Sequence, residues 1–237
     1  MRVEELSTYG RTFDYMPRKA MFPLMRVMFS ELTKKFGLFG TVGFLRKVTQ
    51  KQKQLKAMYS DIVNQRWPDV PAISELYIMA AMYLVIAESE GKEKAYDGFL
   101  KVLMQRISPT AHGSIYDINN LKKIEGDIFA NFCKLNRSLF ENGNTKGLYG
   151  VEEIRDSENL QYVRVTKCLN IDAFSAIECP ELAKLGCDGD IAGYAPNALG
   201  NKVNLDFRRP YTLANGDKAC EFYYYRKGHA PAGMRTI

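Results

Sequence analysis

Hydrophobic residues recur at three- and four-residue spacing through the first 150 residues, which is the pattern of amphipathic helices. One such pattern covers residues 21–36, and Gly37 is expected to end it. A second covers residues 44–67 and stops before Pro68. Residues 1–19 show no clear period, so we expect an arm that precedes the first helix.

The same half of the chain predicts three more helices. Residues 74–87 are apolar nearly all round, which indicates a central helix that is covered on every side. Residues 92–107 form the next helix, which Pro109 is expected to stop, because proline lacks the N–H that a helix interior needs. A fifth helix is predicted over residues 118–140.

After residue 150 the pattern changes to strands. Alternating β-rich residues predict strands at 162–166 and 203–209, and a returning strand at 219–226. The pair Asn215-Gly216 is a strong signal for a two-residue hairpin before the last of them. Short helices are expected between the strands, at residues 171–177, 180–185 and 190–194.

This order of elements predicts an α+β fold, with an N-terminal helical bundle followed by a small antiparallel sheet with short helices. We place a helical region at residues 1–150 and a cysteine-bearing α+β region at residues 151–237, with a single continuous domain as the alternative.

Composition narrows the class of protein. The chain has 237 residues and a net charge of +6, with 46% hydrophobic residues, as in an ordinary globular protein. Its densest basic stretch, at residues 46–56, is interpreted as a solvated helix face, so no nucleic acid is expected. The excess positive charge suits a small anionic substrate. The apolar run at 76–87 is too short to span a bilayer, so no membrane partner is expected.

The N-terminal residues lack the apolar core of a signal peptide, which predicts a cytoplasmic protein with reduced thiols. Cys133 and Cys179 are expected to be structural. Cys168, Cys187 and Cys220 lie at predicted strand ends or a helix start, and a helix start lowers the pKa of a thiol. Reactive and structural roles stay equally open for these three.

Four other residues complete the candidate chemistry. His112, in a predicted loop, is the base suited to neutral pH, and Asp190 lies one helical turn after Cys187. Arg209 and its neighbour Arg208 point to opposite faces of a strand, so one of them can face a pocket and clamp a carboxylate. Thr212 follows three residues after Arg209. Strong zinc-site spacings are absent, so no cofactor is predicted, and a divalent metal is left open.

Four short motifs in order resemble the L-2-amino-thiazoline-4-carboxylic acid hydrolase family over residues 160–225. They are Val165-Thr166-Lys167-Cys168, Cys187-Asp188-Gly189-Asp190, Phe207 through Leu213, and Gly216 through Cys220-Glu221-Phe222. Two positions depart from the family pattern. Glu221 replaces an aspartate, and Pro210 stands where the family has a threonine after the arginine, which removes a hydroxyl.

The resemblance implies hydrolysis of a C–N bond in a small cyclic amidine or imidate that carries a carboxylate, such as a thiazoline. Cys187 would attack the C=N carbon, while Asp190 and His112 would orient groups or transfer protons. Arg209 would hold the carboxylate. Cys168 and Cys220 would line the pocket or substitute for Cys187 as the nucleophile, and Cys220, Thr212 and Tyr194 would contact the substrate.

A second resemblance leads to a different class of protein. Cys187, Gly193-Tyr194 and Cys220 are arranged as in small-ligand sensor domains of the 4-vinyl-reductase type, which bind a small molecule without turnover. A sensor usually carries an output domain, and the sequence shows none, which favours the enzyme. The oligomeric state is not predicted.

Overall fold

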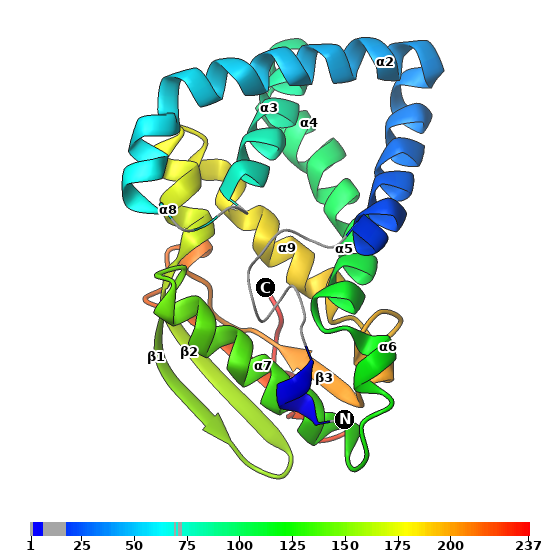
Figure 1. Ribbon diagram of the computed structural model, residues 1–237, viewed down its shortest axis with the longest axis vertical. Coiled ribbons are helices and arrows are strands. Elements are labelled where there is room, and N and C mark those ends of the chain that lie inside the picture. Colours follow the sequence, from blue (N-terminus) through cyan, green and yellow to red (C-terminus); the bar gives the residue numbers. More distant parts are fainter. Residues whose placement is uncertain (1, 7–17, 69, 71–72) are drawn as a thin grey trace.

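The computed structural model describes residues 2–6, 18–68, 70 and 73–237, and these form an α+β fold (Figure 1). The helices are α2 (Arg18–Arg66), α3 (Ile73–Glu90), α4 (Lys92–Ala95), α5 (Lys101–Ile115), α6 (Ile118–Leu121), α7 (Ile128–Thr145), α8 (Leu169–Ala176) and α9 (Lys184–Gly193). The strands are β1 (Tyr149–Asp156), β2 (Leu160–Cys168), β3 (Leu205–Arg208) and β4 (Cys220–Arg226). Short 3-10 helices include Val3–Glu5, η3 (Pro180–Ala183), Gly200–Lys202 and η5 (Leu213–Asn215), and a π-helical turn, Tyr96–Leu100, joins α4 to α5.

The first two predicted helices are the two parts of α2. Gly37 interrupts the helix with a φ of 69° and a ψ of 172°, a left-handed backbone that suits glycine, so the predicted stop at this residue is confirmed. The second part ends at Arg66, just before Pro68. The predicted arm at residues 1–19 falls largely outside the described residues.

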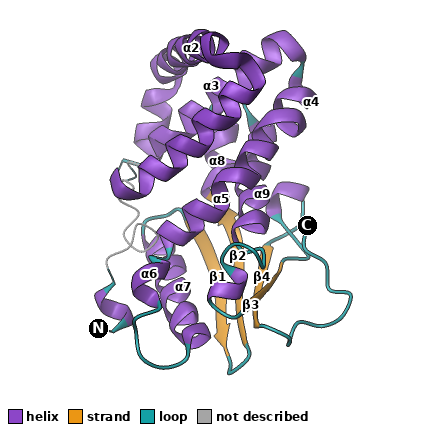
Figure 2. Ribbon diagram, turned by 90° about the vertical axis from the view of Figure 1, so that its right-hand side faces the viewer, coloured by secondary structure: helices purple, strands orange, loops and turns teal. Residues whose placement is uncertain are grey.

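α3 is the central helix that its sequence predicts. Ala80, Ala81 and Tyr83 have no exposed surface, and α2 packs over α3. Buried residues of α2, α3, α5 and α8 form one hydrophobic cluster, which we call the helical cluster. Figure 2 shows α2, α3 and α4 on one side of the molecule and the sheet on the other, with α5 and α9 between them.

Two predicted helix boundaries are wrong. The helix containing Pro109 continues to Ile115, because α5 packs closely along α9 and this contact outweighs one missing backbone hydrogen bond. The helix predicted at 118–140 is two helices, since Gly126 adopts a φ of 95° between α6 and α7. Asp127 then caps α7 by accepting from the backbone N–H of Phe129 at 2.8 Å.

The sheet has the antiparallel order β1-β2-β4-β3. The three predicted strands are present, and β1 is an additional edge strand. The predicted two-residue hairpin at Asn215-Gly216 is wrong. β3 pairs with β4 from Leu205↔Arg226 to Arg208↔Tyr223, so the whole segment 209–219, including η5, connects the two strands. Gly216 still takes the left-handed conformation, with a φ of 89°.

A second set of buried residues, the sheet cluster, joins the sheet to α6 and α7. The two clusters do not divide the chain near residue 150. Phe129 and Phe132 of α7 belong to the sheet cluster, whereas Phe174 of α8 and Leu182 of η3 belong to the helical cluster. In the described ranges, no helix is both long enough and apolar enough to cross a bilayer.

Candidate active site

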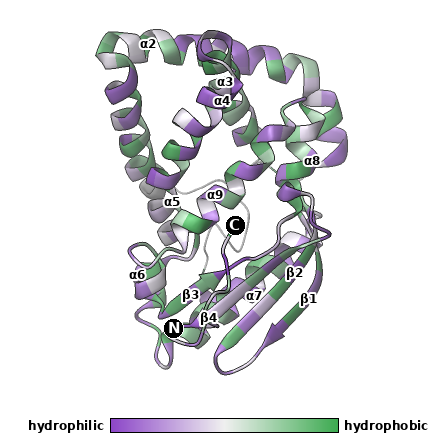
Figure 3. Cartoon of the chain, turned by 180° about the vertical axis from the view of Figure 1, so that it is seen from behind, coloured by the Kyte–Doolittle hydropathy of each residue, from purple (hydrophilic) through white to green (hydrophobic). Residues whose placement is uncertain are grey.

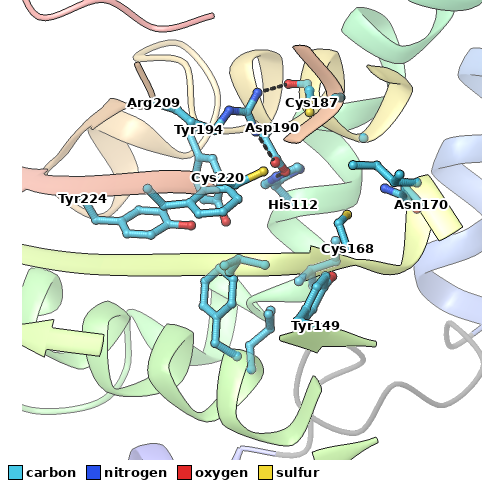
Figure 4. Close-up of a pocket in the computed structure, with 18 of the residues that line it drawn as sticks. His112, Tyr149, Cys168, Asn170, Cys187, Asp190, Tyr194, Arg209, Cys220 and Tyr224 are labelled. Atoms are coloured by element: carbon cyan, nitrogen blue, oxygen red, sulfur yellow. Dashed lines mark hydrogen bonds and ion pairs between the residues drawn. The ribbon is translucent and has the colours of Figure 1, made fainter. Parts of the chain in front are cut away.

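A cavity of about 150 Å³ lies where the two clusters meet, between the sheet and the ends of α5, α7, α8 and α9 (Figure 4). Its polar and sulfur-bearing wall residues are His112, Tyr116, Tyr149, Cys168, Asn170, Cys187, Asp190, Tyr194, Arg209, Cys220 and Tyr224. Apolar residues such as Ile115, Phe140, Val165 and Phe222 complete the wall. Seven of the eight residues singled out in the sequence therefore line one cavity, and Thr212 does not.

The three cysteines reach this cavity from three elements: Cys168 from the end of β2, Cys187 from α9 and Cys220 from the start of β4. Cys168 and Cys187 are partly exposed, whereas Cys220 is buried and its sulfur accepts the Leu213 N–H at 3.3 Å. Cys133 and Cys179 are buried outside the cavity, as expected of structural thiols.

His112, Asp190 and Arg209 form a linked set of charged and polar groups. Arg209 Nη1 donates to Asp190 Oδ2 at 2.8 Å, and the other carboxylate oxygen lies 3.5 Å from His112 Nε2. His112 Nδ1 lies 3.1 Å from the Ser108 carbonyl, which can only accept. Both ring nitrogens of His112 thus face acceptors; in the neutral tautomer that donates to the closer Ser108 carbonyl, Nε2 is the basic nitrogen in the cavity. Because α5 continues past Pro109, His112 belongs to the last turn of a helix and not to a loop.

Arg209 is fully buried, and its guanidinium is already held on several sides. Beyond the ion pair, Nη2 donates to the Cys187 carbonyl at 2.8 Å, and Nε and Nη2 reach the Ile237 carbonyl at 3.3 and 3.2 Å. Four of its five N–H groups are thus used within the protein. Arg208, on the opposite face, is partly exposed and donates to the Phe207 carbonyl.

The prediction that a helix begins at Cys187 is wrong, because α9 begins at Lys184. Cys187 is the fourth residue of α9, and η3 leads directly into that helix, so its thiol gains nothing from a free helix terminus. Cys168 instead occupies the N-cap position of α8, where the backbone N–H groups of Asn170 and Ile171 favour its thiolate, although its sulfur makes no capping hydrogen bond.

Burial raises the pKa of all three cavity thiols. It raises the pKa of Cys168 to about 11 and that of Cys220 to about 12, although backbone N–H groups oppose the shift at both. Burial also raises the pKa of Cys187, as do the nearby Asp190 and Asp188 carboxylates, whereas the Arg209 guanidinium and the Thr212 hydroxyl oppose this rise. Of the three, Cys187 alone has a guanidinium as the main group that favours its thiolate.

Glycines on α9 allow other side chains to approach it closely. A Cβ built on Gly193 would lie 2.1 Å from His112 Nδ1, and one on Gly186 would lie 2.2 Å from Asn170 Nδ2. One on Gly189 would meet Met104 and Ser108 of α5 at 3.0 Å. Positions 186, 189 and 193 share one helical face, so this spacing is a sequence signal for the close contact that our sequence analysis did not use.

A buried chain of hydrogen bonds begins at Tyr194 and Tyr116, which line the cavity. The hydroxyls of Tyr194 and Tyr116 bond to each other, and Tyr116 donates to Asn136 at 2.7 Å. Asn136 donates to Gln161 at 2.6 Å, and Gln161 donates to Asp156 at 2.8 Å. The Tyr194 ring also meets His112 edge-on, with ring centroids 4.7 Å apart. Sequence analysis singled out Tyr194 but missed Tyr116 and Asn170, because neither lies in a recognisable motif.

Thr212 supports the site from outside the cavity. It is buried and caps η5, and its hydroxyl accepts the Asn215 N–H at 3.2 Å. Within the described residues, no group of three or more His, Cys, Asp or Glu side chains is arranged to hold a metal ion.

An α+β protein with a small pocket lined by thiols, a histidine and an ion pair between buried Arg209 and partly exposed Asp190 has the parts of a small-molecule enzyme. Residues 72–224 match the sequence model of the L-2-amino-thiazoline-4-carboxylic acid hydrolase family, and the chain belongs to that family. The match extends well into the helices on the N-terminal side of the motifs. No curated protein and no solved structure matches the chain.

Proposed function

We propose that the protein is a cysteine hydrolase that opens a C–N bond of a small thiazoline-like ring carrying a carboxylate. The observation that carries this proposal is the convergence of Cys187, His112 and Asp190 in one small cavity. Family membership supports the hydrolase class and the ring type. The volume of about 150 Å³ supports a single small ring, since a cavity of that size holds about one benzene molecule.

In the proposed reaction, the Cys187 sulfur adds to the C=N carbon of a 2-amino-thiazoline. The bond between that carbon and the ring nitrogen then breaks, and the nitrogen leaves as a primary amine. The thiol proton and one proton of the exocyclic amino group go to this nitrogen. Water adds to the resulting S-linked carbon, and the Cys187 thiol is released with an open-chain carbamoyl product, so substrate and one water give one product.

Each neighbouring residue has a role in this scheme. His112 Nε2 is the base that carries the protons, and its contact with the Ser108 carbonyl holds it in the required tautomer. Asp190 stabilises the imidazolium at 3.5 Å. Arg209 positions Asp190, offsets the burial of Cys187 and has one N–H left for a substrate carboxylate. The Asn170 carboxamide, beside Cys168 in Figure 4, is a second donor for that carboxylate.

Hydrolysis of L-2-amino-thiazoline-4-carboxylate by Cys187→Ser, Cys168→Ser and Cys220→Ser variants tests the assignment. We expect Cys187→Ser to lose at least a thousandfold in kcat and the other two to keep a measurable rate. Iodoacetamide labelling followed by mass spectrometry should then modify Cys187 before Cys168. Full activity of Cys187→Ser would rule out this nucleophile, and loss in Cys168→Ser alone would transfer the role to the thiol at the N-cap of α8.

A small-ligand sensor remains the second candidate, because the cavity is closed on many sides and a buried pocket alone also suits binding without turnover. The same assay separates the two. A sensor would bind the thiazoline carboxylate stoichiometrically in calorimetry and leave it unchanged after prolonged incubation.

A further inference from the structure

The outer face of α2 carries a feature that the cavity does not explain. This helix contains eleven Lys or Arg residues and two acidic ones, a net charge of +9, whereas the whole chain carries +6. Three large apolar residues at its bend are also strongly exposed: Phe39 is 90% exposed, Val42 62% and Leu38 59%. Isolated exposed apolar residues are common, but a cluster of this kind on a basic helix marks an interaction surface.

The apolar and basic residues share one side of the helix. Residues 38, 42, 46, 53 and 56 follow three-, four- and seven-residue spacings, which place them on one face, opposite the buried Phe44, Val48 and Leu55. Among the described residues, Arg46, Lys53 and Lys56 make no ion pair, and all three are exposed. Figure 1 shows this part of α2 at the end of the molecule away from the sheet, and Figure 3 shows polar and apolar residues interleaved along it.

We propose that this face, defined by Leu38, Phe39, Val42, Arg46, Lys53 and Lys56, docks on an anionic phospholipid surface. Exposed lysines and arginines complement the lipid headgroups, while Phe39 and Leu38 enter the boundary of the acyl chains. A helix that lies on a membrane needs no spanning segment. The expectation of no membrane partner considered only spanning segments, so it did not address this mode of binding.

Charge disfavours a second copy of the chain on the same face. Of the two acidic residues of α2, Glu31 lies before the bend and Asp61 lies beyond Lys56, so a two-fold pairing of this face would bring cations against cations. Nucleic acid would use the same cations but would leave Leu38 and Val42 exposed to water, because aliphatic side chains at a helix bend have no base or phosphate partner.

The test is co-flotation of the full-length protein with vesicles of phosphatidylcholine alone or with 30% phosphatidylglycerol added. We expect binding to the anionic vesicles only, reduced in 0.5 M NaCl because salt screens the headgroups. Arg46→Glu with Lys53→Glu should weaken binding at least twentyfold, from about fivefold for each cation removed. Phe39→Ser should weaken it about tenfold. Lys122→Glu, an exposed lysine of the sheet half, is the matched control and should change binding less than twofold.

Light scattering and a gel shift with double-stranded DNA are run on the same variants. A dimer that Phe39→Ser converts to monomer, without vesicle binding, would overturn the proposal in favour of self-association. DNA binding without vesicle binding would overturn it in favour of nucleic acid, and no binding to either vesicle would also reject it. None of these measurements uses a thiazoline, so the result is independent of the proposed enzymatic activity.

Discussion

Among the residues that the structure describes, the helical cluster, with 27 buried residues, is larger than the sheet cluster, with 20, and the two sides of the molecule differ in the polar groups that they bury. On the helical side the buried polar side chains are small hydroxyls, such as Thr41 and Ser108, and charged residues form ion pairs at the surface, such as Lys51 with Glu88. The sheet side buries Asn136, Gln161 and Arg209, each hydrogen-bonded. An apolar cluster tolerates small changes of shape, whereas a buried polar set works only when every member keeps its partner. The cavity lies beside the buried polar set, so the positions of its wall residues depend on these hydrogen bonds.

Breaking the ion pair of buried Arg209 with Asp190 should give the largest effect. In Asp190→Asn, Arg209 keeps its charge but loses its carboxylate partner while its side chain stays 1% exposed. We expect the free energy of unfolding to fall by about 3–5 kcal/mol in urea titrations. The control is Asp97→Asn, which breaks an exposed pair with Lys101 on the helical side and should cost less than about 1 kcal/mol. Equal losses in the two variants would show that the two regions do not differ in this respect.

Adding one methyl group at matched glycines should give effects of opposite sign. Gly193→Ala places a Cβ against the His112 ring, so we expect a loss of about 1–3 kcal/mol and a lower kcat. Gly43→Ala, in α2, has nothing within 4 Å of the new Cβ and should gain about 0.5–1 kcal/mol, because alanine favours helix. Thermal unfolding of both variants checks this. Stabilisation by Gly193→Ala would mean that α5 and α9 can separate freely.

Removing single polar groups from the two clusters sharpens the comparison further. Gln161→Leu removes the acceptor of the buried Asn136 amide and the donor to Asp156 and to the Cys133 carbonyl, so a loss of about 1–3 kcal/mol is expected. Tyr77→Phe removes a buried hydroxyl that has no partner among the described residues of the helical cluster, and stability should stay the same or rise slightly. Chemical denaturation of both variants measures the difference, and a large loss in Tyr77→Phe would contradict it.

Ionisation of the buried thiols should have the smallest effect on the free energy of unfolding at neutral pH. Burial raises the pKa of Cys133 and Cys220 to about 12 and that of Cys179 to about 11, from an ordinary value of 9.0. Between pH 9 and those values, the folded protein keeps protons that the unfolded chain has lost. Stability is therefore unaffected below about pH 8 and falls as the pH rises above 9. Urea unfolding at pH 8, 9 and 10 should show this decline, and Cys133→Ala should make it shallower.

The sequence predicts the helices best where one strong pattern meets one clear stop, as at Gly37 in α2. It misses β1 because register shifts between Gly150 and Glu153 break the alternation on which a strand prediction depends. It misplaces the end of α5 because Pro109 is tolerated once the helix packs on α9, which is tertiary information. Local patterns therefore located elements but not the contacts that extend or divide them.

For the candidate site, too, the sequence identified most of the residues but not the contacts between them. The convergence of Cys168 and Cys220 follows from their places at the ends of neighbouring strands β2 and β4. The partnership of His112 with Asp190 does not follow from any spacing, because 78 positions separate them and only the packing of α5 on α9 brings them together. Arg209 was expected to face the pocket, which it does, but its contacts with Asp190 and Ile237 were not foreseen.

α2 also bears on how this protein could have diverged from its relatives. The region shared with the family begins at residue 72, so the helix that covers α3 lies outside it. Leu32, Val48 and Leu55 of α2 are nonetheless buried against the shared core. Selection can therefore change the outer surface of α2 without touching the pocket, while its inner surface must evolve together with α3. A member of the family can in this way change the surface to which α2 binds, while the residues that line its pocket stay the same.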